Sequence, residues 1–189
     1  MRIAFLIRSL GNGGAERQLV SLATGLVARG HHVAVITFYC GGFHEGDLRG
    51  GGVTLMSLEK KGRWDLAGAA LRLLQILRGE RYDVLHSYLT GANILAAIVS
   101  PFLPRTELVW GVRASNMDLS KYDRTTRLSA VAERLLSRSA RLIIANSLAG
   151  MNHAVGRGFP ADRCVVIHNG IDHRRFVFSV AGREQMRST

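Results

Sequence analysis

Short apolar runs alternate with helix-like patterns along most of the chain. Several runs, such as residues 33–36 (Val-Ala-Val-Ile), are continuously apolar instead of alternating with polar residues. A strand has such a composition when helices cover both of its faces, as in a parallel sheet. We therefore predict seven strands, at residues 2–7, 32–38, 53–58, 83–88, 107–113, 140–147 and 164–168.

Apolar residues recur at helical spacing between these strands. This spacing runs from Ala15 to Leu26, and Gly30 follows where the end of a helix favours a left-handed residue. The same pattern predicts further helices at residues 65–78 (closed by Gly79), 91–99, 121–137 and 148–157. Short strand-helix-strand steps favour right-handed crossovers, so we predict an α/β fold with a doubly wound, mainly parallel, seven-stranded Rossmann-like sheet.

The pattern changes after residue 172. Residues 173–189 carry several charged side chains, including Arg174 and Arg175, but complete no apolar pattern. We therefore expect one Rossmann-like domain at residues 1–172 and an interdomain linker stub at residues 173–189, followed by a second domain that is absent from this chain.

The composition indicates a domain with a substantial core, since 47% of the 189 residues are hydrophobic. Cys40 and Cys164 lie far apart without a second thiol or a paired histidine at metal-ligand spacing, so we expect reduced thiols and no zinc site. The chain begins without the pattern of a secretory signal. The most apolar segment, residues 92–103, falls short of the roughly 20 residues that cross a bilayer. These features predict a cytoplasmic protein.

The charge balance is strongly basic, with 25 Lys and Arg against 14 Asp and Glu and a net charge of +11. Nucleic acid, an anionic membrane surface and a phosphate-bearing substrate are competing explanations, beside a merely solvated basic face. Aromatic residues make up 7% of the chain and are not interleaved with the basic residues. A platform for base stacking needs such interleaving, so a nucleic-acid-binding α/β module is the less favoured alternative, and we expect no nucleic-acid partner.

Ligands of doubly wound sheets bind beyond the carboxyl ends of the strands. The first such loop contains Gly13 and Gly14, whose backbone amides can approach a phosphate at the start of a helix, although a tight turn also favours glycine. Glu16 stands where the dinucleotide fingerprint has its third glycine, and Thr37 and Phe38, not an acid, end the second strand. A Rossmann-type oxidoreductase or epimerase is therefore a second, disfavoured alternative.

Polar residues follow several other strands. His86, Ser87 and Tyr88 end the fourth strand and are candidates for an acceptor pocket, although they could equally satisfy the free amides of the next helix. Asn146 and Ser147 end the sixth strand, and Asn169 follows the seventh. We include all of these as candidate substrate-binding residues, although a strand end with glycine could be only a turn.

Arg113 is the strongest single candidate for a functional side chain. It ends the fifth strand and is followed by Ser115 and Asn116, which we take as further substrate-binding candidates. A guanidinium can hold a phosphate or carboxylate through paired, charge-assisted hydrogen bonds. The alternative is a structural salt bridge to Asp118 or Glu133.

Together these segments resemble the retaining glycosyltransferases of family 4. The resemblance covers almost the whole chain and depends on the order and spacing of residues 13–16 (Gly-Gly-Ala-Glu), 29–33, 83–86 and 166–172, with Phe176. It implies the GT-B architecture, in which two Rossmann-like domains face a cleft. This chain would be the N-terminal domain, with Gly13 and Gly14 facing the donor diphosphate.

The resemblance also implies a reaction and partners. A sugar would move from a nucleotide-diphosphate sugar to a glycan or lipid-linked acceptor with retained configuration, as in cell-envelope polysaccharide synthesis, without a further cofactor or metal. The second domain would supply most donor contacts and the family's paired-glutamate motif, so this chain alone is expected to be nearly inactive. Peripheral contact with the anionic inner face of a membrane would fit the basic charge.

The family commonly places a histidine near the reacting sugar, where this chain has Arg113-Ala114-Ser115-Asn116. An arginine remains protonated and can only donate hydrogen bonds or offset negative charge. The resemblance therefore assigns Arg113 electrostatic support of the leaving diphosphate or the acceptor, not the role of a general base.

Overall fold

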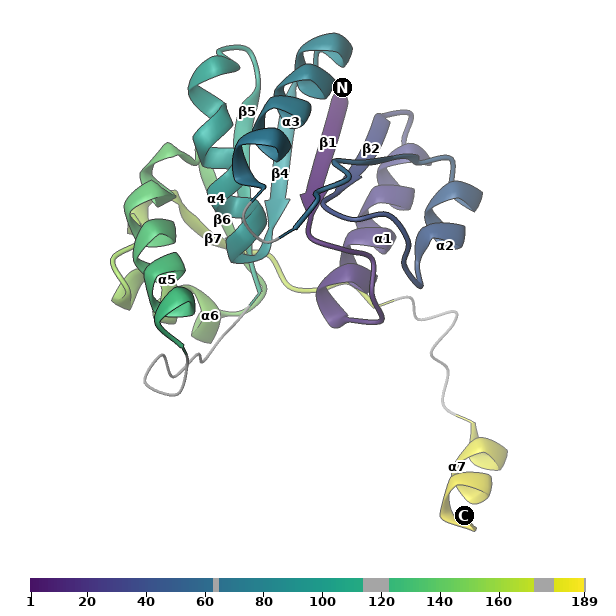
Figure 1. The fold of residues 1–189 in the computed structure, drawn as a ribbon. Coiled ribbons are helices and arrows are strands. Elements are labelled where there is room, and N and C mark those ends of the chain that lie inside the picture. The colour runs from purple at the N-terminus through teal and green to yellow at the C-terminus, as the bar shows by residue number, and fades with distance from the viewer. Residues whose placement is uncertain (63–64, 114–122, 172–178, 189) are drawn as a thin grey trace.

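The computed structural model describes residues 1–62, 65–113, 123–171 and 179–188 (Figure 1). Its seven strands form one entirely parallel sheet in the order β3-β2-β1-β4-β5-β6-β7. The strands are β1 (Arg2–Ile7), β2 (His32–Thr37), β3 (Thr54–Ser57), β4 (Val84–Tyr88), β5 (Glu107–Val112), β6 (Leu142–Ala145) and β7 (Cys164–Val166). This topology confirms the predicted doubly wound α/β fold.

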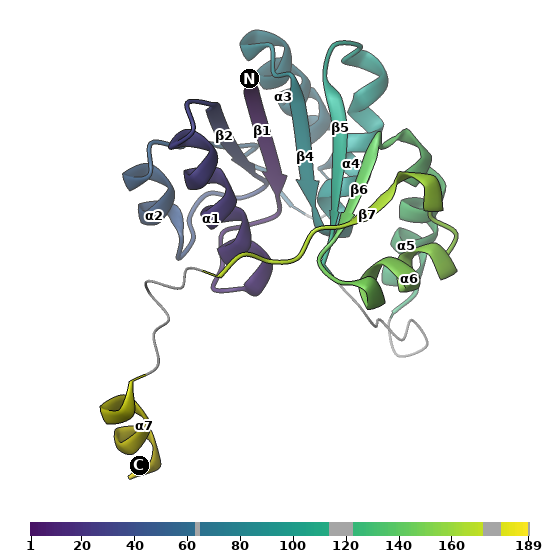
Figure 2. The same cartoon turned by 180° about the vertical axis from the view of Figure 1, so that it is seen from behind.

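Helices cover the sheet on both faces. The helices that pack on the sheet are α1 (Gly14–Val27), α2 (Glu45–Gly50), α3 (Leu66–Glu80), α4 (Leu89–Val99), α5 (Arg124–Leu136) and α6 (Leu148–Gly156). One more helix, α7 (Val180–Arg187), follows later in the chain. Short 3-10 helices occupy Ser100–Phe102, Ser137–Ser139 and Ala161–Arg163. Figures 1 and 2 show α1 and α2 on one face and α3 and α4 on the other.

Two apolar cores result from this arrangement, one on each face. Ala4 and Leu6 of β1 belong to the core beneath α3, α4 and α6, whereas Phe5 and Ile7 belong to the core beneath α1 and α2. Successive side chains of a strand point to opposite faces. A central strand between two cores must therefore be continuously apolar, which is the pattern that the sequence shows.

The structure differs from the sequence prediction in several helices. The short helix α2 was not predicted. Helix α3 runs past Gly79 to Glu80, and the left-handed residue after it is Arg81, with φ of 50°. By contrast, Gly30 has φ of 81° and confirms the predicted end after α1. Residues 180–187, expected within a linker, form α7.

A buried polar network joins α4, α5 and α6. Glu133 of α5 is 4% exposed, and its carboxylate accepts hydrogen bonds from Asn93 Nδ2 and Thr90 Oγ1, each at 3.1 Å. Arg157, directly after α6, donates to the same carboxylate at 3.4 Å. A buried carboxylate is tolerated only when it is paired and hydrogen-bonded, so this network sets how the three helices pack.

We predict that Arg157→Met destabilises the fold by about 3 kcal/mol, because the Glu133 carboxylate stays buried without its cation. Urea denaturation at neutral pH measures this change. The matched control is Arg141→Met, which breaks the exposed ion pair with Glu107 and should change the unfolding free energy by less than about 1 kcal/mol. Equal losses of unfolding free energy in the two variants would show that the buried pair stabilises the fold no more than the exposed pair does.

Candidate functional site

The carboxyl edge of the sheet collects the ends of all seven strands because the strands are parallel. The connections diverge at the middle of this edge: β1 leads through α1 to β2 on one side, while β4 on its other side leads through α4 to β5. Such a switch point leaves a crevice between two helix N-termini, which is where open α/β sheets bind ligands. Those candidate residues at the ends of β1, β4, β5, β6 and β7 that the structure describes all lie along this edge.

The N-terminus of α1 lies at the switch point. Gly13 is the N-cap residue, and a Cβ atom there would collide with the carboxylate of Glu16. Glu16 thus folds back over the N-cap, where a negative charge stabilises the free amides of the first turn. A Cβ atom on Gly14 would meet no heavy atom within 4 Å in the described structure. The space beside Gly14 is therefore open to a ligand.

Arg113 directly follows β5 and is held by two oxygen atoms. Its Nη2 donates to the hydroxyl of Tyr88 at 2.9 Å, and its Nη1 donates to Asn169 Oδ1 at 2.8 Å. The guanidinium carbon also lies 4.7 Å from the centre of the Tyr88 ring. Because both ends of the guanidinium are held in this way, its remaining N–H groups have a defined direction at the edge of the sheet.

An aromatic stack beneath Arg113 supports this geometry. The His86 ring centre lies 5.3 Å from Phe5 and 4.7 Å from Tyr88. His86 is 6% exposed, and its Nε2 packs against Gly111 and has no hydrogen-bond partner among the described residues. Burial lowers the pKa of His86 to about 3, and the positive charge of Arg113 acts in the same direction. His86 is therefore neutral at physiological pH.

The side chains at the end of β4 are buried and do not line an open surface. Tyr88 is fully buried, and burial raises the pKa of its hydroxyl while the Arg113 charge opposes that rise. Ser87 is also fully buried and donates to Asn93 Oδ1 at 2.8 Å, inside the polar network. We therefore revise the prediction that His86, Ser87 and Tyr88 line an acceptor pocket: His86 and Tyr88 support Arg113, and Ser87 belongs to the interior.

A strap of chain, residues 167–171, crosses the carboxyl edge from β7 to α1 (Figure 2). It is fastened at its start where Ile167 N donates to Ala145 O at 2.9 Å and His168 Nδ1 lies 3.2 Å from Asn146 O. Further along, Asn169 holds Arg113. The strap ends at α1, where Gln18 Nε2 donates to Gly170 O at 3.0 Å.

Of the remaining predicted residues, the structure describes Asn146 and Ser147. Ser147 caps α6, because its hydroxyl accepts from Gly150 N at 3.0 Å, and Asn146 contacts the strap through its backbone carbonyl. The cap favours a structural role for Ser147, whereas substrate binding by the Asn146 side chain stays a prediction. Ser115, Asn116 and Asp118 lie outside the described residues. The alternative salt bridge from Arg113 to Glu133 is wrong, since Glu133 pairs with Arg157.

Gly14 and Arg113 thus lie on the same edge of the sheet. The strands they follow, β1 and β5, are separated only by β4. At ordinary strand spacing, the axes of β1 and β5 are therefore about 10 Å apart. The contacts Gln18–Gly170 and Asn169–Arg113 connect them through the strap. Sequence reasoning missed Gln18, whose only signal was its place one turn into α1.

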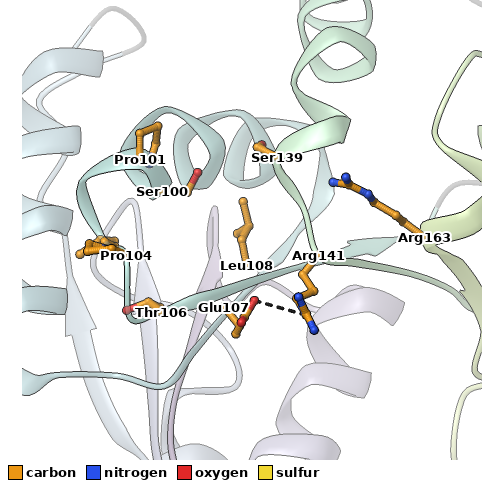
Figure 3. Close-up of a pocket in the computed structure, with 10 residues that line it drawn as sticks. Ser100, Pro101, Pro104, Thr106, Glu107, Leu108, Ser139, Arg141 and Arg163 are labelled. Carbon is orange, nitrogen blue, oxygen red and sulfur yellow. Dashed lines mark ion pairs between the residues drawn. The ribbon is translucent and has the colours of Figure 1, made fainter.

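One hollow of the described structure lies beside the carboxyl edge, and another lies at the opposite edge of the sheet. A cavity of about 840 Å³ lies beside the candidate edge, where Asn12, Arg17 and Phe43 face the end of the strap. A second, of about 590 Å³, lies at the amino ends of the strands and contains the Glu107–Arg141 ion pair (Figure 3). The second hollow is at the wrong end of the strands to belong to the candidate site.

Two negative findings apply to the described part of the chain alone. None of its helices is long and apolar enough to cross a membrane. Nor do its His, Cys, Asp and Glu side chains form a group of three or more that could hold a metal ion.

Comparison with known proteins decides the family. The sequence model of Glycosyltransferase Family 4 matches residues 12–175. The chain belongs to this family. Family 4 membership confirms the resemblance predicted from the sequence, and it argues against both the nucleic-acid-binding module and the Rossmann-type oxidoreductase or epimerase.

Individual relatives agree with this assignment. The structure of Alr3699/HepE from Anabaena in complex with UDP-glucose has a TM-score of 0.78 and 26% identity, covering 100% of this chain and 49% of that one. The α-1,3/1,6-mannosyltransferase ALG2 of Yarrowia lipolytica is 50% identical over 44 residues, 23% of this chain and 10% of ALG2. The corresponding enzyme of Neurospora crassa is 37% identical over 83 residues, 40% of this chain and 18% of that protein. The chain thus spans about half the length of Alr3699/HepE.

We predict that His86 makes the fold sensitive to acid. Its pKa is lowered from 6.5 to about 3 in the folded state, so between these values the unfolded chain binds a proton that the folded chain does not. The free energy of unfolding should therefore fall as pH decreases from 6.5 towards 3. Urea denaturation at pH 7 and pH 5 should show a smaller loss for His86→Phe than for the unmodified protein.

The control for this prediction is His32→Phe, at an exposed position at the start of β2. It should retain the full loss between pH 7 and pH 5. If His86→Phe loses as much stability as the unmodified protein, His86 is not the group that couples folding to pH.

Proposed function

We propose that the carboxyl edge of the sheet binds the diphosphate of a nucleotide-diphosphate sugar during sugar transfer. The observation that carries the proposal is the guanidinium of Arg113, held by Tyr88 and Asn169 on the same edge as the open space beside Gly14 at the N-terminus of α1. A fixed cation and a helix N-terminus are the two groups best suited to an anion. The UDP-glucose bound in the HepE complex is a ligand of this chemical kind.

In this proposal Arg113 acts electrostatically. When the bond from the sugar to the diphosphate breaks, negative charge accumulates on the departing diphosphate. Arg113 and the N-terminus of α1 stabilise that charge without moving, because their positions are set before the substrate binds. His86 takes no part in proton transfer, since it is buried and neutral.

The acceptor is a glycan or a lipid-linked sugar, and transfer retains the configuration of the donor. Support comes from family membership and from the two mannosyltransferases that match part of the chain. We further propose that residues 1–172 form the acceptor-side domain and that a second domain, joined through residues 173–189, supplies most contacts to the donor. The setting is the cytoplasm, at the inner face of a membrane, in cell-envelope polysaccharide synthesis.

We predict that Arg113→Met lowers kcat/KM for sugar transfer about 100-fold or more in the protein that includes the second domain, because one preorganised charge-assisted contact to the diphosphate is lost. Arg113→Lys should recover only part of this loss, since lysine keeps the charge but not the two-pronged geometry. Initial rates with a panel of nucleotide sugars and lipid-linked acceptors measure these changes.

The matched control is Arg141→Met, which removes an arginine from the hollow at the opposite edge of the sheet. It should leave kcat/KM within about twofold. Wild-type rates in Arg113→Met would remove the arginine from the mechanism, and absence of transfer with every donor and acceptor of the panel would contradict the proposed activity itself.

A further inference from the structure

Helix α5 presents three large apolar side chains to solvent. Leu128, Val131 and Leu135 are 70%, 51% and 64% exposed. Their spacing of three and four residues aligns them along one stripe of the helix. A surface helix normally directs such a stripe into the protein, and α5 already has an inward side that contains Ala130 and Glu133. The outer stripe is therefore additional to the one that the fold needs.

Arginines border this stripe along its length. Arg127 and Arg134 are exposed on α5, and Arg138 is exposed in the 3-10 helix that follows directly. With about 100° of rotation per residue, these three positions fall along a second line beside the apolar one. The helix has a single acidic residue, Glu133, and that residue is buried and paired with Arg157. We call the apolar stripe and the arginine line together the α5 face.

The charge of the α5 face indicates what covers it. A symmetric dimer would place the same patch of both copies together, so arginine would face arginine. An anionic lipid surface instead offers phosphate groups to the arginines and hydrocarbon to the leucines. Arginine can reach the headgroups while its aliphatic stem lies along the apolar surface. This combination of a basic line and an apolar stripe is typical of helices that lie in the plane of a membrane surface.

The position of α5 is compatible with a membrane-bound acceptor. Figure 1 shows that α5 lies on the outer flank of the molecule and begins beside the carboxyl edge, where the candidate site lies. A bilayer on this flank would lie next to the candidate site and leave it uncovered.

We propose that the α5 face docks the protein on an anionic lipid bilayer. Leu128, Val131 and Leu135 enter the boundary between headgroups and acyl chains, and the arginines contact lipid phosphates. This assigns a surface to the peripheral membrane contact proposed above. It does not depend on sugar transfer, so failure of either proposal can be recognised separately.

Flotation with lipid vesicles tests the proposal on the full 189-residue chain. The unmodified protein should float with vesicles of phosphatidylcholine containing 30% phosphatidylglycerol, and much less with phosphatidylcholine alone. Leu128→Gln/Leu135→Gln should lower the partition coefficient about tenfold or more, because two apolar side chains no longer leave water. Arg134→Gln/Arg138→Gln should lower it about 25-fold at low salt, from roughly a fivefold loss for each arginine.

The matched control is Leu22→Gln/Arg29→Gln. This pair removes one exposed leucine and one exposed arginine, but from α1 and the residues after it, on the opposite face of the sheet. It should change the partition coefficient by less than about twofold. The altered positions are exposed, so the variants should fold, and urea denaturation of each variant checks this. If a double variant does not fold, the single variant Leu128→Gln replaces it in the flotation assay.

Three results would overturn the proposal. The first is equal flotation with neutral and anionic vesicles, which would remove the role of the arginines. The second is flotation that the α5 and α1 variants reduce alike. The third is absence of flotation together with a dimer in sedimentation velocity that Leu128→Gln/Leu135→Gln dissociates, which would make a second copy of the chain the occupant of the α5 face.

Discussion

The guanidinium of Arg113 is a permanent cation that the fold holds between two oxygen atoms, the Tyr88 hydroxyl and Asn169 Oδ1. Neither oxygen carries a negative charge, so these two contacts orient the positive charge without neutralising it. A salt bridge to a carboxylate would have fixed the same side chain but cancelled its field. The difference decides what the edge of the sheet can attract, because a cation that is held by neutral oxygens retains its preference for an anionic group.

This arrangement has consequences for the surrounding core. The positive charge near the end of β5 disfavours a second cation beside it, and burial keeps His86 in its neutral form. Leu89, directly after Tyr88, has φ of 71°, a left-handed conformation that is uncommon for a leucine. The chain passes there from β4 into α4 without a loop, so Tyr88 stays at the end of the sheet. The strap then supplies the second oxygen and joins Arg113 to α1 through Gln18.

The fold could be predicted from the sequence because it depends on a repeated signal. Runs such as residues 33–36 and the apolar spacing between Ala15 and Leu26 recur for each strand and helix. The short helix α2 was not predicted because six residues give too little periodicity to recognise. The end of α3 was predicted too early because Arg81, not Gly79, adopts the left-handed conformation. Nothing in the local sequence indicates this choice.

The candidate site could be predicted only in part. Arg113 and Gly14 were found because the ends of parallel strands share one edge, a property of topology alone. The direction of a side chain at that edge depends on its neighbours: Ser87 turns inward because Asn93 offers a buried acceptor, and Tyr88 is buried beneath Arg113. The strap could not be predicted, since the contacts of Asn169 and Gly170 join residues that are 56 and 152 positions apart in the chain.

The most direct measurement of the central claim is a titration of the ¹⁵N-labelled chain with UDP, followed by nuclear magnetic resonance. Weak binding suffices for this experiment. We expect the backbone amides of Gly13 and Gly14 and the Nε–H of Arg113 to shift together along one saturation curve. Shifts confined to the hollow around Arg141, or different saturation curves for Gly14 and Arg113, would contradict a single anion site on the carboxyl edge.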